Sequence, residues 1–200
     1  MTFTDRPIDE FLDSVASRAV APSAGAVAGV SAASGTALCE MVCVHTIGKE
    51  GYAAVEEELR EVRENLGDAR TRLLELADAD AEAVDQLRRA LDRDGNDEDA
   101  GATEASVRLV VEIPLEVAEI CREVLDIAPE VVEKGAENAR EDGLTGVLLT
   151  HAALQSSLRL VRANLEDVGD AAFVAEVGDR VRRLEADADR ALERAFSAGE

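Results

Sequence analysis

The sequence predicts an all-α protein, an up-and-down bundle of about six long helices, some of them kinked. Apolar residues recur at steps of three and four along most long segments, which is the spacing of one helix face. No segment shows sustained alternation of apolar and polar residues, the pattern of a strand. With 200 residues and 46% hydrophobic content the chain can bury one sizeable core, so we expect a single domain over residues 1–200.

The first predicted helix begins at Thr4 or Asp5 and has Pro7 in its first turn, where proline is favoured. Its apolar face carries Ile8, Phe11, Leu12 and Val15. The second covers about residues 24 to 46. Residues 19–39 carry no charge and are long enough to cross a bilayer, but small residues dominate them, so we favour a buried helix over a membrane span. Positions that would let another helix approach closely are Gly25, Gly29, Ser31 and Gly35.

The third predicted helix follows Gly51, runs to about Leu91, and has an aspartate where its apolar seam requires a leucine. The seam residues are Val55, Leu59, Val62, Leu66, Ala69, Leu73, Leu76, Asp80, Ala83 and Leu87. Removing an ionised carboxylate from water is costly unless the charge is paired. We therefore interpret Asp80 as weakly buried, neutralised, or used in function.

The remaining helices follow the same pattern. One starts near Thr103, where Pro114 removes the amide bond to Val110 and predicts a kink; Pro129 should bend or restart it, and it ends near residue 135. The next runs from about residue 140 to 165, and the last from 171 to 196. The helix over 140–165 has an apolar seam at Leu144, Val147, His151, Leu154, Leu158, Val161 and Leu165. Its neighbouring stripe, which we expect to face a pocket, is Asp142, Gly146, Leu149, Ala153, Ser156, Leu160 and Asn164.

The formal net charge of −22 excludes most nucleic-acid binding, because a phosphate backbone would be repelled over most of the surface. Basic residues are almost all arginine, and acidic residues are abundant, which suggests adaptation to a salt-rich cytoplasm. Salt screens self-repulsion, so the melting temperature should rise steeply with KCl, as thermal unfolding would measure.

We expect no metal centre. The acidic loop at 92–102 opens like a calcium loop but has Asp97 where the turn glycine is required, so a solvated loop is favoured. Cys39 and Cys43 share a helix face from which His45 points away, and we interpret them as core residues. His151 fits a hydrogen-bonded core histidine better than a general base. Three cysteines without a secretory signal favour a reducing cytoplasm.

Several segments, taken in order, resemble the cyclodeaminase/cyclohydrolase family, meaning the C-terminal domain of formiminotransferase-cyclodeaminase and the stand-alone methenyltetrahydrofolate cyclohydrolases. The resemblance covers nearly the whole chain. Its blocks are IDEFLDSVAS at 8–17, MVCVHTIGKEGY at 41–52, LADADAEAV at 76–84, IPLEVAE at 113–119, NAREDG at 138–143 and VRANL at 161–165.

The resemblance implies a homodimer, in contact with neither membrane nor nucleic acid, that acts on a folate with no cofactor beyond its tetrahydrofolate substrate. The reaction would be closure of formiminotetrahydrofolate with loss of ammonia, or addition of water to methenyltetrahydrofolate. Asp80 is the implied general acid/base, because a desolvated carboxylate stabilises a cationic centre and can be tuned toward neutral pH. The implied substrate-binding residues are Pro22, Gly25, Lys49, Asp142 and Asn164.

Some of these positions depart from the family. Its Pro-Gly-Gly-Gly-Ser turn is Pro22-Ser23-Ala24-Gly25-Ala26 here, its basic cluster after Gly48 is reduced to Lys49, and its aromatic residue after the Asp80 block is Val84. Asp142 and Asn164 are separated by about 33 Å of helix, so they would serve different sites or meet across a dimer. Two alternatives stay open: a member without catalysis that acts as a helical binding or dimerisation module, and an enzyme that acts on a different folate or amidine.

Overall fold

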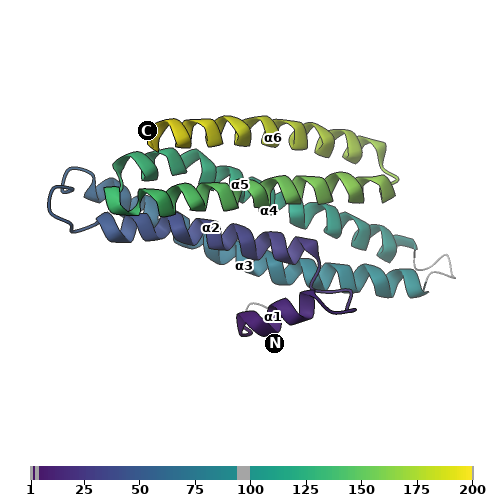
Figure 1. The fold of residues 1–200 in the computed structure, drawn as a ribbon. Helices are drawn as coiled ribbons and strands as arrows, with labels where there is room; N and C mark the ends of the chain where they lie inside the picture. The colour runs from purple at the N-terminus through teal and green to yellow at the C-terminus, as the bar shows by residue number, and fades with distance from the viewer. Residues whose placement is uncertain (1, 3–4, 94–99, 200) are drawn as a thin grey trace.

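Long helices joined by short connections make up the protein (Figure 1). The computed structural model describes residue 2 and residues 5–93 and 100–199. Within these residues it contains helices and no strand, which confirms the all-α prediction. The helices are α1 (Ile8–Val15), α2 (Ala24–Thr46), α3 (Glu56–Arg93), α4 (Ala100–Lys134), α5 (Arg140–Asn164) and α6 (Ala171–Gly199), with short 3-10 helices η2 (Glu137–Ala139) and η3 (Leu165–Asp167).

The predicted ends of α2 and α5 agree with the structure, but two other boundaries were wrong. Pro7 has extended backbone angles and precedes α1 as its N-cap, and Asp5 lies in a turn before it. Helix α4 begins at Ala100, before the predicted start near Thr103, and does not restart at Pro129. Buried residues on both sides of this proline, among them Ala128 and Val131, hold the helix in the core. Thr4 and the centre of the predicted acidic loop, residues 94–99, lie outside the described residues.

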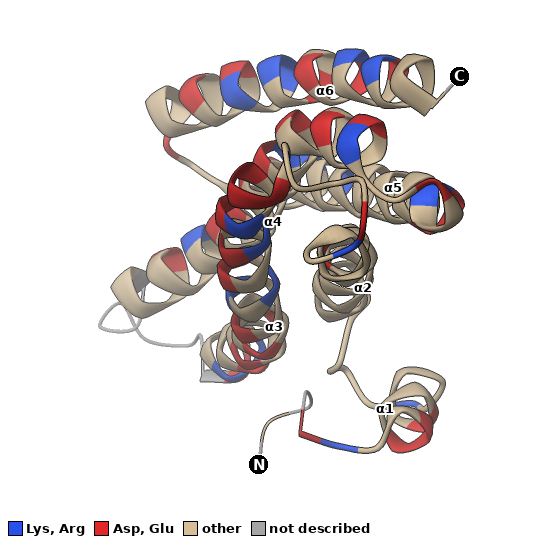
Figure 2. Ribbon diagram, turned by 90° about the vertical axis from the view of Figure 1, so that its left-hand side faces the viewer, with Lys and Arg blue, Asp and Glu red and all other residues tan. Residues whose placement is uncertain are grey.

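Helix α2 packs mainly against α3 and α5 and less extensively against α4. It is almost free of charged residues, whereas α3, α4 and α6 carry them along their lengths (Figure 2). The most apolar 18-residue window of α2 has a mean hydropathy of 1.6 and is long enough for a membrane span, but half of this window is buried inside the protein. This packing favours the interpretation of α2 as a core helix.

Small residues bring the neighbours of α2 unusually close. A Cβ atom added at Gly29 would lie 2.9 Å from the Cβ of Ala77 in α3. On the other side, a Cβ added at Gly35 would lie 2.7 Å from the carbonyl oxygen of Gly146 in α5. Both distances are too short for a real side chain, so the glycines permit the backbone approach that the sequence predicted.

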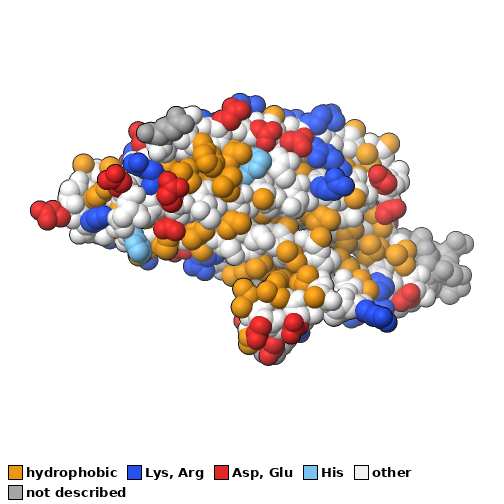
Figure 3. Space-filling view, viewed as in Figure 1, with side chains coloured by type: hydrophobic (Ala, Val, Ile, Leu, Met, Phe, Trp, Pro, Cys, Tyr) orange, Lys and Arg blue, Asp and Glu red, His pale blue; other side chains and the backbone are white. Residues whose placement is uncertain are grey.

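Helix α1 lies apart from the bundle, joined to it by residues 16–23 (Figures 1 and 2). Phe11 is its buried residue, while the other apolar side chains of its amphipathic face stay exposed: Ile8 at 72%, Leu12 at 55% and Val15 at 37%. Apolar side chains gather on the face of the molecule that carries α1, α2 and α5 (Figure 3). This face is therefore an open apolar surface in the single chain.

Candidate functional site

Asp80 lies on α3 and faces the first turn of α2. Its side chain is only 6% exposed. The Ser23 hydroxyl donates a hydrogen bond of 3.0 Å to Oδ2 of Asp80, and the backbone N–H of Ala26 donates a second. Ser23 is the N-cap residue of α2 but makes no capping bond to its own helix. Asp80 thus caps α2 from a neighbouring helix, placing a carboxylate at the positive end of the helix dipole.

Gly25 makes this arrangement possible. A Cβ atom added there would lie 2.6 Å from Oδ2 of Asp80 and closer still to Oδ1 and Cγ. Any other residue at this position would push the carboxylate out of the turn. Pro22 precedes the turn and follows a cis peptide bond from Ala21. The structure therefore places Gly25 against Asp80, while Pro22 lies next to Ser23 at the start of the turn.

The pKa of Asp80 is raised above its ordinary value. Burial is the main cause, because the charged form loses its hydration, while the hydrogen bonds from Ser23 and Ala26 oppose the rise. Among the three interpretations that the sequence left open for Asp80, weak burial is excluded. A buried carboxyl group with a raised pKa and specific donors has the properties of a tunable acid or base.

A cavity of about 610 Å³ opens on the other side of the first turn of α2. Its walls come from the end of α1, from residues 19–31, and from α5. Three residues of the predicted pocket-facing stripe line it, namely Leu149, Ala153 and Ser156. The volume is within the range of small-molecule sites, and the walls are mostly apolar with a few hydroxyl groups.

Lys49 and Asp142 lie at the opposite end of the bundle from Asp80. The 23 residues of α2 separate Lys49 from the Ser23 turn by about 35 Å. Lys49 donates a hydrogen bond of 2.6 Å to the Asn138 side chain. Asp142 is exposed in the first turn of α5, next to Gly143, which packs beside Val42 near the end of α2. Within one chain, neither side chain can reach a ligand beside Asp80.

Asn164 has a partner in α4. Its Nδ2 donates a hydrogen bond of 2.6 Å to the carbonyl oxygen of Val110. That carbonyl would normally bond to the amide four residues later, but Pro114 occupies the position and has no N–H. Asn164 therefore satisfies the acceptor that Pro114 leaves free, which gives it a structural function.

We expect Asn164→Ala to lower the free energy of unfolding by about 1–2 kcal/mol, because the carbonyl of the buried residue Val110 loses its donor. In a Pro114→Ala background the restored N–H can bond to Val110, so the same substitution should cost much less. Urea unfolding of the two single variants and the double variant measures this difference. An equal cost in both backgrounds would contradict the compensation.

The cysteines are core residues as predicted, whereas His151 is hydrogen-bonded but only partly buried, with a side chain that is 18% exposed. His151 Nε2 lies 2.9 Å from Oδ1 of Asp189 in α6, which gives the ring a hydrogen-bond partner. Burial raises the pKa of Cys39 to about 12 and that of Cys43 to about 11, so both thiols stay protonated, and His45 is exposed away from them. Among the described residues, no three His, Cys, Asp or Glu side chains are grouped to hold a metal ion.

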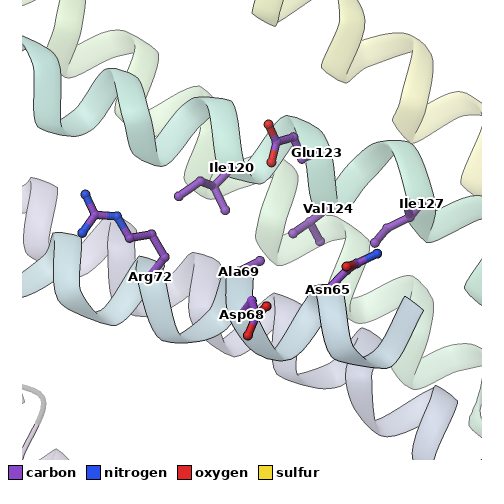
Figure 4. Close-up of a pocket in the computed structure, with 8 residues that line it drawn as sticks. All are labelled: Asn65, Asp68, Ala69, Arg72, Ile120, Glu123, Val124 and Ile127. Atoms are coloured by element: carbon purple, nitrogen blue, oxygen red, sulfur yellow. The ribbon is translucent and has the colours of Figure 1, made fainter. Parts of the chain in front are cut away.

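A second cavity, about 430 Å³, is a groove between α3 and α4 (Figure 4). Ala69, Ile120 and Val124 form apolar walls, and Arg72 at one end pairs with Glu116. None of the residues proposed from the sequence as site residues lines this groove. The cavity beside the Ser23 turn is therefore the better candidate.

Ser23 is the residue that sequence reasoning missed. The sequence analysis treated it only as a lost glycine. In the structure its hydroxyl contacts Asp80, and the residue belongs to the lining of the cavity. A serine directly before a helix predicts an N-cap, which correctly places it at the start of α2. The contact with Asp80 joins residues 57 positions apart, and no local pattern predicts it.

Known proteins similar to this chain agree with one another. The family model described as formiminotransferase-cyclodeaminase matches residues 7–183. A methenyltetrahydrofolate cyclohydrolase from Methylorubrum extorquens is 37% identical over 183 residues, 89% of this chain and 86% of that protein. The formimidoyltransferase-cyclodeaminase of Sus scrofa is 30% identical over 90% of this chain, which spans 34% of that protein's length. The crystal structure of a formiminotetrahydrofolate cyclodeaminase from Thermotoga maritima matches with a TM-score of 0.91 at 28% identity, covering 98% of this chain and 96% of that one.

Proposed function

The chain belongs to the formiminotransferase-cyclodeaminase family, and on this premise we propose that it is an enzyme of folate one-carbon metabolism that acts on methenyltetrahydrofolate. The observation that carries the proposal is the similarity to the stand-alone cyclohydrolase, which extends over nearly the full length of both chains. The Thermotoga cyclodeaminase supports formiminotetrahydrofolate as the second candidate substrate, because its fold matches almost completely.

The Asp80 site supports either reaction. In the cyclohydrolase reaction, water adds to a cationic carbon held between two nitrogens and must lose a proton. In the cyclodeaminase reaction, a nitrogen attacks the formimino carbon and ammonia leaves after gaining a proton. A buried carboxylate of raised pKa lowers the energy of a nearby cation and exchanges protons closer to neutral pH. No cofactor beyond the tetrahydrofolate derivative is needed for either step.

The test is the decay of the ultraviolet absorbance of methenyltetrahydrofolate with purified protein in molar KCl, where the acidic surface is screened. Enzyme-dependent decay identifies a cyclohydrolase. If decay is not accelerated, the assay is repeated from formiminotetrahydrofolate, and release of ammonia then identifies a cyclodeaminase. Inactivity in both assays would contradict the proposal and favour a binding or dimerisation module.

We also propose that the chain works as a homodimer, with the unpaired thiols suited to a reducing cytoplasm. Two observations support this. Apolar side chains at the mouth of the cavity are exposed, among them Val15, Val20 at 51% and Leu149 at 38%. Lys49 and Asp142 are too far from Asp80 to serve the same ligand within one chain. A second copy on this face would bury the apolar surface and would bring additional residues to the cavity.

Sedimentation velocity at micromolar concentration should give the mass of two chains. Because Leu12 is 55% exposed on the apolar face of α1, Leu12→Glu should shift the mass toward one chain without lowering the melting temperature of the bundle. Arg182→Glu is the matched control, because Arg182 is exposed on the charged face of α6 rather than on the apolar face. This change should leave the mass unchanged. A single-chain mass for the unmodified protein would reject the dimer.

A further inference from the structure

The Asp80 carboxyl group is adjacent to the cavity but does not open into it. The first turn of α2 separates the two, and Asp80 is not among the residues that line the cavity. A ligand in the cavity therefore cannot contact the carboxylate directly in this conformation. If Asp80 exchanges protons with such a ligand, an intermediate group must connect them.

Ser23 is placed to be that group. Ser23 is a half-buried residue in the lining of the cavity, and its hydroxyl donates a hydrogen bond of 3.0 Å to Oδ2 of Asp80. A hydroxyl oxygen that donates one hydrogen bond can still accept another, so its lone pairs remain able to receive a proton from the cavity side. The chain of groups thus runs from the cavity through Ser23 Oγ to Asp80.

The other serines of the cavity lining, Ser31 and Ser156, are not among the hydrogen-bond partners of Asp80, which are Ser23 and the N–H of Ala26. Ser156 donates its proton to the carbonyl of Ala152 in its own helix. Gly25 fixes the carboxylate against the turn, since a side chain there would displace it from Ser23. The Ser23 hydroxyl is therefore the contact that the described residues provide between this cavity and the buried carboxyl group.

We propose that Ser23 is a proton relay between the substrate cavity and Asp80, a role that rests on the proposed function of the site. In water addition, the water oxygen forms a bond to the methenyl carbon while one of its O–H bonds breaks. That proton passes to Ser23 Oγ as the serine's own proton passes to Asp80 Oδ2, so the serine is unchanged and the aspartate becomes neutral. When the carbon–nitrogen bond opens, that proton returns along the same path to the leaving ring nitrogen. The new hydroxyl group becomes the formyl carbonyl, and its proton is released to solvent.

The experiment compares kcat and KM for methenyltetrahydrofolate over a range of pH in the unmodified protein, Ser23→Ala, Ser23→Thr and Asp80→Asn. We expect Ser23→Ala to lower kcat about tenfold or more with little change in KM, and Ser23→Thr, which keeps a hydroxyl, to recover most of the loss. Ser34→Ala is the matched control, because its exposed hydroxyl bonds only within α2. It should leave kcat unchanged.

A pH profile separates a relay from a structural effect. The groups that shift the pKa of Asp80 are its buried surroundings, the Ser23 hydroxyl and the Ala26 N–H, with no charged side chain of α2, α3 or α4 among them. Ser23 lowers the pKa of Asp80, so its removal should move the acidic limb of kcat/KM to higher pH. The solvent deuterium isotope effect on kcat should also change in Ser23→Ala.

The outcomes are distinguishable. An active unmodified protein in which Ser23→Ala keeps full kcat and an unshifted pH profile would overturn the relay and leave the proposed function standing. Loss of kcat in both Ser23→Ala and Ser23→Thr, at unchanged melting temperature, would also overturn it, because the hydroxyl would not be the determinant. An unmodified protein inactive on both folates overturns the proposed function and the relay together.

Discussion

Replacing Gly25 by alanine should abolish most activity and lower the free energy of unfolding by about 1–3 kcal/mol, although it adds only one methyl group. The new Cβ would overlap the Asp80 carboxyl group, which must then leave the turn. The hydrogen bonds from Ser23 and Ala26 to the carboxylate would be lost, and the N-terminus of α2 would lose its cap. Urea unfolding and the methenyltetrahydrofolate assay measure the two effects.

Gly178 in α6 supplies the matched control. A Cβ added there would meet only the flexible end of Arg182 at 3.8 Å, so Gly178→Ala should stabilise the protein by about 0.5–1 kcal/mol through its better helix propensity. In an Asp80→Ala background the obstacle at Gly25 is absent, and Gly25→Ala should cost little. If Gly25→Ala is as harmless as Gly178→Ala in the unmodified protein, the carboxylate is not held where the structure places it.

The helices could be predicted from the sequence because their signals are local. The interruption of the α3 seam by Asp80, the run of small residues in α2 and the proline in α4 are each visible within one or two turns. The predicted starts of α1 and α4 differ from the observed ones, because proline and alanine are compatible with both a helix end and its continuation. The resemblance to a family added the roles of Asp80, Pro22 and Gly25, and the structure places Gly25 directly against Asp80.

The rest of the site depends on contacts between distant segments. The bond from Ser23 to Asp80 and that from Asn164 to Val110 both require the helices to be packed, and neither follows from periodicity. Lys49 and Asp142 were grouped with Asp80 by resemblance alone, and the length of α2 keeps them apart within one chain. Sequence patterns identified candidate side chains, whereas the packed helices determine which of them can act on one ligand.

The second large effect is expected for Asp80→Asn, which should lower kcat by about 10²–10⁴-fold, because an amide can neither accept the proton nor stabilise a cation with full charge. Its oxygen can still accept the Ser23 hydrogen bond, so the fold should persist.

The folded-state pKa of Asp80 is raised, so ionisation in the folded protein costs stability. Relative to the variant, the unmodified protein should therefore be most stable below the unfolded pKa of about 3.9 and should lose stability as pH rises through the raised folded value.

Activity should rise over the pH range in which stability falls, since the base form of Asp80 exists only above its raised pKa. In the unmodified protein kcat/KM should therefore rise with pH through that pKa, and any residual rate of Asp80→Asn should lack this limb.

Asp80→Leu distinguishes a functional carboxylate from a defect in the core. If Asp80 were a defect in the core, leucine would repair it and the melting temperature would rise. We expect the melting temperature to fall instead, because leucine removes the cap of α2 and leaves the Ser23 hydroxyl and the Ala26 N–H without their acceptor. Full activity in Asp80→Asn would exclude Asp80 as the acid/base, whatever leucine does.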